Sequence, residues 1–137
     1  MHGPSLFVVG VDGSETSWRA LHYAFGLARR QGSTVVAVFS FVPIITYITS
    51  AADVYYAGED MAAELRGAVC ALSAELDVAA EFIATERDPV VILTALADER
   101  HADAIILGAS KTLGHKIFGS KAARMLRRCR CPVIVVP

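Results

Sequence analysis

The sequence lacks a long apolar run and has few aromatic residues, and these absences exclude several classes of protein. Its longest apolar run, residues 35–45, is interrupted by Ser40 and Pro43 and is too short to cross a membrane. Aromatic residues make up 8% of the 137 residues, so the hydrophobic fraction of 54% comes mainly from Ala, Val, Leu and Ile. A charged fraction of 20% is too low for a disordered tail or a coiled coil. The composition therefore predicts a single domain over residues 1–137 with its own core.

Cysteine is scarce, and its pattern argues against both disulfides and a metal site. The three cysteines are Cys70, Cys129 and Cys131. An odd count, with no basic segment before the first apolar run, indicates reduced thiols and a cytoplasmic location. Cys129 and Cys131 lack the second pair of ligands that a zinc site needs. We therefore expect no metal site and interpret both thiols as small apolar filling.

Several common catalytic and nucleotide-binding motifs are also missing. The chain contains no Gly-x-x-x-x-Gly-Lys-Ser/Thr loop and no Gly-x-Gly-x-x-Gly turn, which excludes the standard NTPase and dinucleotide sites. No serine lies in a Gly-x-Ser-x-Gly elbow. His22, within an expected helix, and His115, in a polar loop, have no placed partner that would make either one a general base. We therefore assign no catalytic residue.

Acidic residues are absent from the last 30 residues, which contain seven of the 13 Lys and Arg. These basic residues are Lys111, Lys116, Lys121, Arg124, Arg127, Arg128 and Arg130. Such an asymmetry indicates either an anionic ligand or a solvated helix face, and composition alone leaves both open. A pI of 6.4 and the lack of aromatic residues among these basic ones argue against a nucleic-acid partner.

Segments typical of strands and helices alternate along the chain. Short apolar runs predict strands at residues 6–11, 34–41, 78–84, 104–107 and 133–136. Helical spacing predicts helices over residues 15–31, 61–76, 89–100 and 119–131. Residues 43–58 have the weakest pattern and are expected to form the longest loop. This order predicts a doubly wound, five-stranded parallel sheet, an α/β fold with right-handed crossovers.

Local signals mark several of the expected helix ends. Asp12 and Glu15 have the spacing of a capping box, and Ser14 is a second candidate cap. Gly32 is a C-terminal stop signal, and Asp88-Pro89 is typical of a helix start. In the last helix, one face is expected to carry the apolar residues and the other the basic ones. The apolar residues are Ala122, Met125, Leu126 and Cys129.

Two glycine-bearing junctions follow expected strands at the edge where ligands bind in such sheets. The first is the turn Gly10-Val11-Asp12-Gly13-Ser14, which carries a carboxylate. The second runs from Gly108 to Ser120 and ends at the start of a basic helix. Free N–H groups and the helix dipole there favour a phosphate. Glycine-rich turns are also common without any ligand, so both interpretations remain open.

Five segments together carry a resemblance to a known family: residues 6–15, the pair Asp88-Pro89, residues 102–108, the pair Gly119-Ser120 and residues 131–136. In this order they resemble the universal stress protein family. The resemblance covers essentially the whole chain in order. It implies a Rossmann-like sheet of order 3-2-1-4-5 with two helices on each face. In that order Val133–Val136 is a short, wholly apolar edge strand, so we expect a homodimer formed by antiparallel pairing of this strand with its counterpart in a second copy.

Nucleotide-binding members of this family carry Gly-x-x-Gly, nine residues and then Gly-Ser or Gly-Thr. Gly108 and Gly119-Ser120 match this motif, whereas Lys111 replaces the second glycine and the following segment is two residues shorter. The resemblance implies an adenine-nucleotide site at nine positions, in three parts. The adenine and ribose end comprises Val11, Asp12 and Ser40. Gly108 passes beside the ribose. The phosphate end comprises Ser110, Lys111, Gly119, Ser120 and Lys121.

Two functions are therefore expected as alternatives. One is a sensor or regulatory module in the stress response that binds ATP or another adenine nucleotide, with or without Mg²⁺, and at most hydrolyses ATP slowly. The short phosphate segment predicts weak binding with little preference among ATP, ADP and AMP. The other is a dimeric stress-response interaction protein whose nucleotide site is vestigial. Neither involves a membrane or a nucleic acid.

Overall fold

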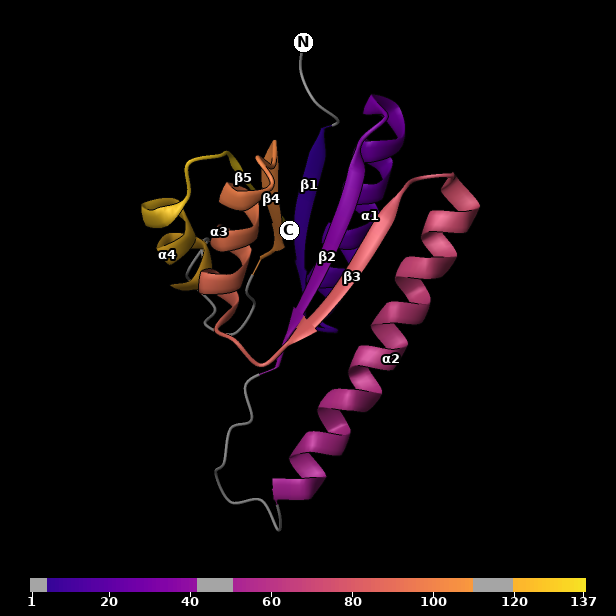
Figure 1. Cartoon of the computed structure of the whole chain (residues 1–137), viewed down its shortest axis with the longest axis vertical. Helices are drawn as coiled ribbons and strands as arrows, with labels where there is room; N and C mark the ends of the chain where they lie inside the picture. Colours follow the sequence, from indigo (N-terminus) through magenta and orange to yellow (C-terminus); the bar gives the residue numbers. More distant parts are fainter. Residues whose placement is uncertain (1–4, 42–50, 110–119) are drawn as a thin grey trace.

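All five strands form one parallel sheet, in the order β3-β2-β1-β4-β5. The computed structural model describes residues 5–41, 51–109 and 120–137. The strands are β1 (Leu6–Val11), β2 (Thr34–Ser40), β3 (Ala80–Thr85), β4 (Ala104–Gly108) and β5 (Val133–Val136). The helices are α1 (Glu15–Gln31), α2 (Ala51–Leu76), α3 (Pro89–Glu99) and α4 (Ser120–Arg128). Figure 1 shows the strands side by side with helices around them. The expected fold class and strand order are confirmed.

Each face of the sheet is covered by two helices, as expected. Phe7 and Val9 of β1 pack with Phe25 of α1 and Leu65 of α2 in one buried cluster. Val8, the residue between them, belongs to a second cluster with residues of α3 and α4. Successive side chains of a strand point to opposite faces, so a β1 that is apolar throughout can supply both clusters. No helix within the described ranges is long and apolar enough to span a membrane.

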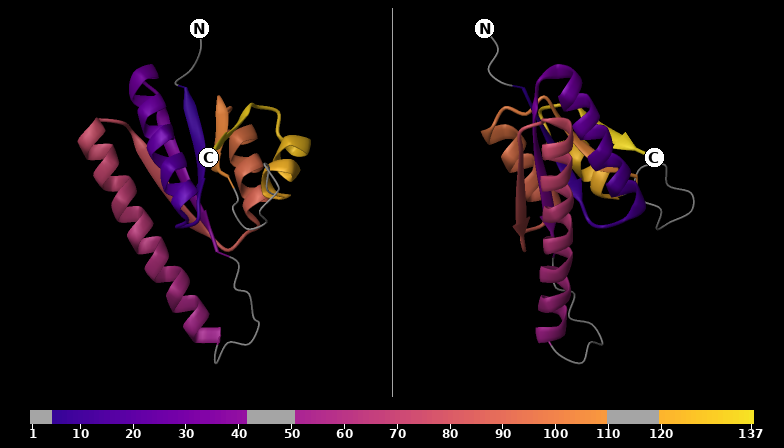
Figure 2. Two further views of the ribbon diagram at one scale, coloured as in Figure 1. Left: turned by 180° about the vertical axis from the view of Figure 1, so that it is seen from behind. Right: turned by 90° about the vertical axis from the view of Figure 1, so that its right-hand side faces the viewer.

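The start of α2 corrects the expectation of a loop over residues 51–58, whereas residues 43–50 of that expected loop lie outside the described residues. The helix begins at Ala51, ten residues before Met61, the first position with a clear helical pattern, and it is 26 residues long. Extending an existing helix costs much less free energy than nucleating one, and Ala51 and Ala52 are good helix formers. The N-terminal part of α2 runs past the carboxyl ends of the strands (Figures 1 and 2). The spacing of apolar residues did not predict this part of the helix because it lies beyond the sheet.

The first turn of α1 decides between the two expected caps. Ser14 is the N-cap, and its Oγ accepts a hydrogen bond from the Ser17 N–H at 3.2 Å. The Asp12 carboxylate instead accepts from the Ser14 N–H at 2.9 Å, which closes the turn that precedes the helix. The stop at Gly32 is confirmed, with φ of 69° and its N–H bonded to the Ala28 carbonyl.

The helices α3 and α4 begin and pack largely as expected, with one exception. Asp88 caps α3 by accepting from the Val91 N–H at 3.1 Å. In α4, Ala122 and Met125 are buried, whereas Leu126 is 59% exposed and was wrongly placed on the apolar face. Residue 126 lies about 40° around the helix from residue 122 and about 100° from residue 125, so it is at the margin of the apolar face, where packing has already ended.

Candidate functional site

A cavity of about 570 Å³ opens at the carboxyl ends of the strands, on the face covered by α3 and α4. It lies where the strand order reverses, between β1 and β4, which is the usual ligand position in doubly wound sheets. Its size is within the range of small-molecule sites. The fold therefore places a ligand-sized cavity at the expected edge.

The inner wall of the cavity is apolar. Val38, Leu107 and Val135 come from three different strands, and Leu93 comes from α3. Gly10 of β1 lies among them, and a Cβ atom there would approach Leu107 Cδ2 to 2.9 Å and Leu93 Cδ1 to 3.1 Å. Because Gly10 has no side chain, the two leucines leave this part of the cavity open. An apolar surface of this kind suits the flat face of a heterocycle.

Asp12 supplies a fixed negative charge at the cavity. Its backbone N–H donates to Ser17 Oγ at 3.2 Å, and Ser17 Oγ donates to the Ser14 carbonyl at 3.0 Å, so the turn is held from both sides. Burial alone would raise the pKa of Asp12. Hydrogen bonds from Ser14 and Ser17 and the charge of Lys121 outweigh burial, and the pKa lies below its ordinary value. The carboxylate is therefore ionised at neutral pH and can accept hydrogen bonds from hydroxyl or amino groups.

Lys121 supplies a positive charge to the same cavity. It lies in the first turn of α4, is half-buried, and lines the cavity together with Ala122. The amino end of a helix carries a partial positive charge, which adds to that of the ammonium group. The cavity thus combines a carboxylate, a cationic end and an apolar wall.

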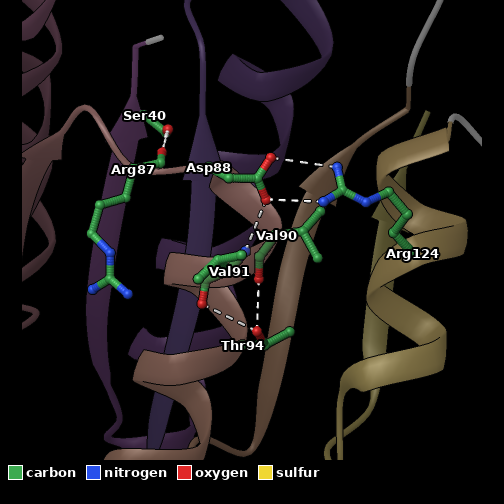
Figure 3. Close-up of polar contacts among 7 residues, drawn as sticks. All are labelled: Ser40, Arg87, Asp88, Val90, Val91, Thr94 and Arg124. Carbon is green, nitrogen blue, oxygen red and sulfur yellow. Dashed lines mark hydrogen bonds and ion pairs between the residues drawn. The ribbon is translucent and has the colours of Figure 1, made fainter.

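The turn between β3 and α3 joins β2 to α4 at the rim of the cavity. Figure 3 shows Ser40 Oγ donating to the Arg87 carbonyl and Arg124 paired with Asp88. The two Arg124–Asp88 hydrogen bonds measure 3.1 and 3.4 Å. Burial would raise the pKa of Asp88, but the Val91 N–H and the Arg124 guanidinium lower it. Arg124 therefore does more than solvate the outer face of its helix, because it links α4 to the start of α3.

Gly108 packs against α1. A Cβ atom on Gly108 would lie 2.4 Å from the carbonyl carbon of Thr16 and 2.6 Å from the backbone nitrogen of Ser17. The next residue, Ala109, accepts a hydrogen bond from Thr16 Oγ1 at 2.7 Å. Gly108 therefore allows the end of β4 to contact the first turn of α1, a role that sequence reasoning missed. Sequence reasoning also missed Thr16 and Ser17 as lining residues of the cavity, although hydroxyl side chains in the first turn of the helix that follows β1 could have indicated them.

The structure brings five of the nine predicted site residues to the cavity. They are Val11, Asp12, Ser40, Gly108 and Lys121. Ser120 is the first residue of α4, while Ser110, Lys111 and Gly119 lie outside the described residues. Over the described ranges, no group of three or more His, Cys, Asp or Glu is arranged to hold a metal ion.

A doubly wound parallel sheet with a polar-rimmed cavity at its switch point defines a class of α/β domains that bind small ligands at this edge. Comparison with protein families then identifies the family: the Universal stress protein family profile matches residues 6–137, and the chain belongs to that family. The recognition from sequence is thereby confirmed. No curated protein sequence is significantly similar to the chain.

Solved structures of similar fold include complexes with nucleotides. A universal stress family protein from Burkholderia pseudomallei has a TM-score of 0.78 and 26% identity, covering 97% of this chain and 96% of that one. A universal stress protein in complex with cAMP has a TM-score of 0.71 and 28% identity, covering 98% of both chains. One from Archaeoglobus fulgidus in complex with dAMP has a TM-score of 0.68 and 26% identity, covering 100% of both.

Proposed function

We propose that this protein binds an adenine nucleotide in the cavity and acts in the cytoplasm as a sensor or regulatory module in the stress response. The observation that carries the proposal is the joint presence of ionised Asp12, half-buried Lys121 and an apolar wall in one cavity. The cAMP and dAMP complexes of two similar proteins support the choice of an adenine nucleotide.

Each part of a nucleotide has a chemically suitable counterpart here. The base would contact the apolar wall near Val38 and Leu107. The Asp12 carboxylate would accept hydrogen bonds from ribose hydroxyls. The hydroxyl of Ser40 already donates to Arg87, so the backbone near Ser40 and Val11 is the part left for the base. Lys121 and the start of α4 would meet a phosphate.

The remaining phosphate contacts are proposed from the family motif. Ser110, Lys111, Gly119 and Ser120 would complete that end of the site, with Gly108 passing beside the ribose. The segment from Gly108 to Gly119 is two residues shorter than the motif, so it wraps a triphosphate poorly. We therefore propose weak binding with little preference among ATP, ADP and AMP, with or without Mg²⁺. We propose no catalytic residue, and ATP hydrolysis at most slow.

Thermal unfolding of variants tests this proposal. AMP at about a hundredfold its dissociation constant should stabilise the wild type by about 2.7 kcal/mol, which raises Tm by several degrees. Lys121→Ala should weaken AMP binding about tenfold, because it removes a charged partner of the phosphate. Arg127→Ala, on the exposed side of the same helix, is the control and should leave affinity unchanged.

The outcomes separate the two functions. An equal loss of AMP affinity in the two variants would mean that α4 attracts anions over its whole basic surface and has no defined phosphate site. No change in wild-type Tm with millimolar AMP, ADP or ATP would rule out the nucleotide proposal and leave the dimeric interaction protein with a vestigial site.

We also propose that β5 pairs with its counterpart in a second copy to form a homodimer. All four residues of Val133–Val136 are apolar and half-buried, and within the described residues no strand pairs with the outer edge of β5. An apolar edge strand of this kind readily pairs with another. The two strands would run antiparallel about a two-fold axis.

Light scattering checks the dimer. The wild type should have the mass of two chains at micromolar concentration, and Ile134→Lys should have the mass of one, because two lysines would meet near the axis. Glu64→Lys introduces the same side chain on α2, which covers the part of the sheet near β3, and should leave the dimer intact. A wild-type monomer would contradict the proposal.

A further inference from the structure

Two thiols lie in contact in the turn that connects α4 to β5. The Sγ atoms of Cys129 and Cys131 are 3.1 Å apart. The backbone on both sides of the turn is fixed: the Cys129 N–H donates to the Met125 carbonyl at 2.8 Å, and the Pro132 carbonyl accepts from Ile105 at 2.9 Å. The pair is therefore held together by α4 on one side and β4 on the other.

The pair is accessible to a small reagent. Both cysteines are half-buried and pack against the apolar cluster beneath α3 and α4. Cys131 also lines a surface recess of about 370 Å³ together with Asp98, His101 and Arg130. Burial, and then its neighbour Cys129, raise the pKa of Cys131 to about 12, so Cys131 stays protonated at neutral pH.

We propose that Cys129 and Cys131 are a redox pair that closes a disulfide across Arg130 when a small hydroperoxide reaches the turn. The Cys129 thiolate attacks one peroxide oxygen, the O–O bond breaks, and for hydrogen peroxide the leaving hydroxide is protonated to water. The resulting sulfenic acid is attacked by the Cys131 sulfur. The S–O bond breaks, and a second water leaves with the thiol proton of Cys131. Two thiols thus reduce one hydrogen peroxide to two waters, and a dithiol reductant reverses the bond.

The geometry requires only a small movement. A disulfide needs the sulfurs about 2.05 Å apart, so each sulfur must move by about half an ångström from the observed contact. Closure would tie the end of α4 to the start of β5. The opposite end of α4 carries Lys121, and β5 is the edge strand of the sheet. The redox pair does not depend on nucleotide binding and goes beyond the function proposed above.

Cys70 provides an internal control. It is exposed on α2, which packs on the opposite face of the sheet from α4. It has equal or better access to peroxide but cannot reach the pair. If exposure alone decided oxidation, Cys70 would react first.

Mass spectrometry of the folded full chain tests the proposal. After hydrogen peroxide treatment and thiol alkylation, we expect chains of monomer mass in which neither Cys129 nor Cys131 is alkylated. The peptide that contains both should be lighter by two hydrogens, and dithiothreitol should restore its two thiols. Formation of this disulfide should be about tenfold faster than oxidation of Cys70, because the neighbouring thiol captures the sulfenic acid. In Cys131→Ser the loss of two hydrogens should disappear, and dimedone should trap a sulfenic acid at Cys129. Two free thiols at positions 129 and 131 when Cys70 is already oxidised would overturn the proposal, as would stable sulfenic acid at Cys129 in the wild type.

Discussion

Gly108→Ala is expected to lower the free energy of unfolding by about 3 kcal/mol or more, as severe overpacking does. The new Cβ atom would lie 2.4 Å from the carbonyl carbon of Thr16, which is much shorter than a van der Waals contact. The atoms it would overlap are backbone atoms in the first turn of α1. Backbone atoms in a hydrogen-bonded turn cannot rotate away as the end of a side chain can. Relief would require α1 to shift from β4, which would also strain the bond from Thr16 to Ala109. Urea unfolding followed by circular dichroism measures the loss.

Gly67→Ala is the matched control for this substitution. Gly67 lies within α2 and is exposed, and a methyl group on it would point into open space. The same change there should raise the free energy of unfolding by about 0.5–1 kcal/mol, because alanine is the better helix former. If the Gly108 variant is as stable as the wild type, the close contact between β4 and α1 is wrong.

Gly10→Val is expected to weaken AMP binding by about tenfold or more, with little change in stability. A side chain at residue 10 would press on Leu107 Cδ2 and Leu93 Cδ1, and both leucines line the cavity. These are the ends of flexible side chains, so they can rotate, and the free space into which they move is the cavity. Valine favours a strand, which offsets part of the packing cost. Isothermal titration calorimetry with AMP measures the affinity.

Gly26→Ala is the control for the binding measurement. Its new methyl group would lie 3.7 Å from a nitrogen of Arg30 at its closest, away from the cavity. It should bind AMP as the wild type does. If a folded Gly10→Val protein binds AMP with unchanged affinity, the nucleotide binds outside this cavity.

The sequence predicted those parts of the fold that depend on local patterns. Continuous apolar runs identified β1 and β2, and Gly32 and Asp88 marked helix ends through turns that involve only neighbouring residues. The strand order came from the family resemblance together with the handedness of crossovers. Leu126 was misplaced because helical spacing defines a broad apolar face, and only packing shows where that face ends.

The candidate site was predicted less completely, because its contacts join distant parts of the chain. Asp12 and Lys121 were found from junctions after strands. The pairing of Arg124 with Asp88 joins residues 36 positions apart and leaves no periodic signal in either segment. Gly108 was chosen for its place in a motif, whereas its contact with α1 depends on how β4 meets a helix from the other end of the sequence.

The central position of β1 has a consequence for the order in which the chain can fold. Val8 pairs with Val36 on one side and with Ile105 on the other. The first partner follows soon after β1 along the chain, whereas the second comes only after α2, β3 and α3. Until β4 forms, one side of the central strand keeps its backbone groups unpaired and its apolar side chains partly uncovered. Closing that long loop is a slow step that depends on distant contacts, and a nascent chain waiting for it presents an edge on which other chains can aggregate.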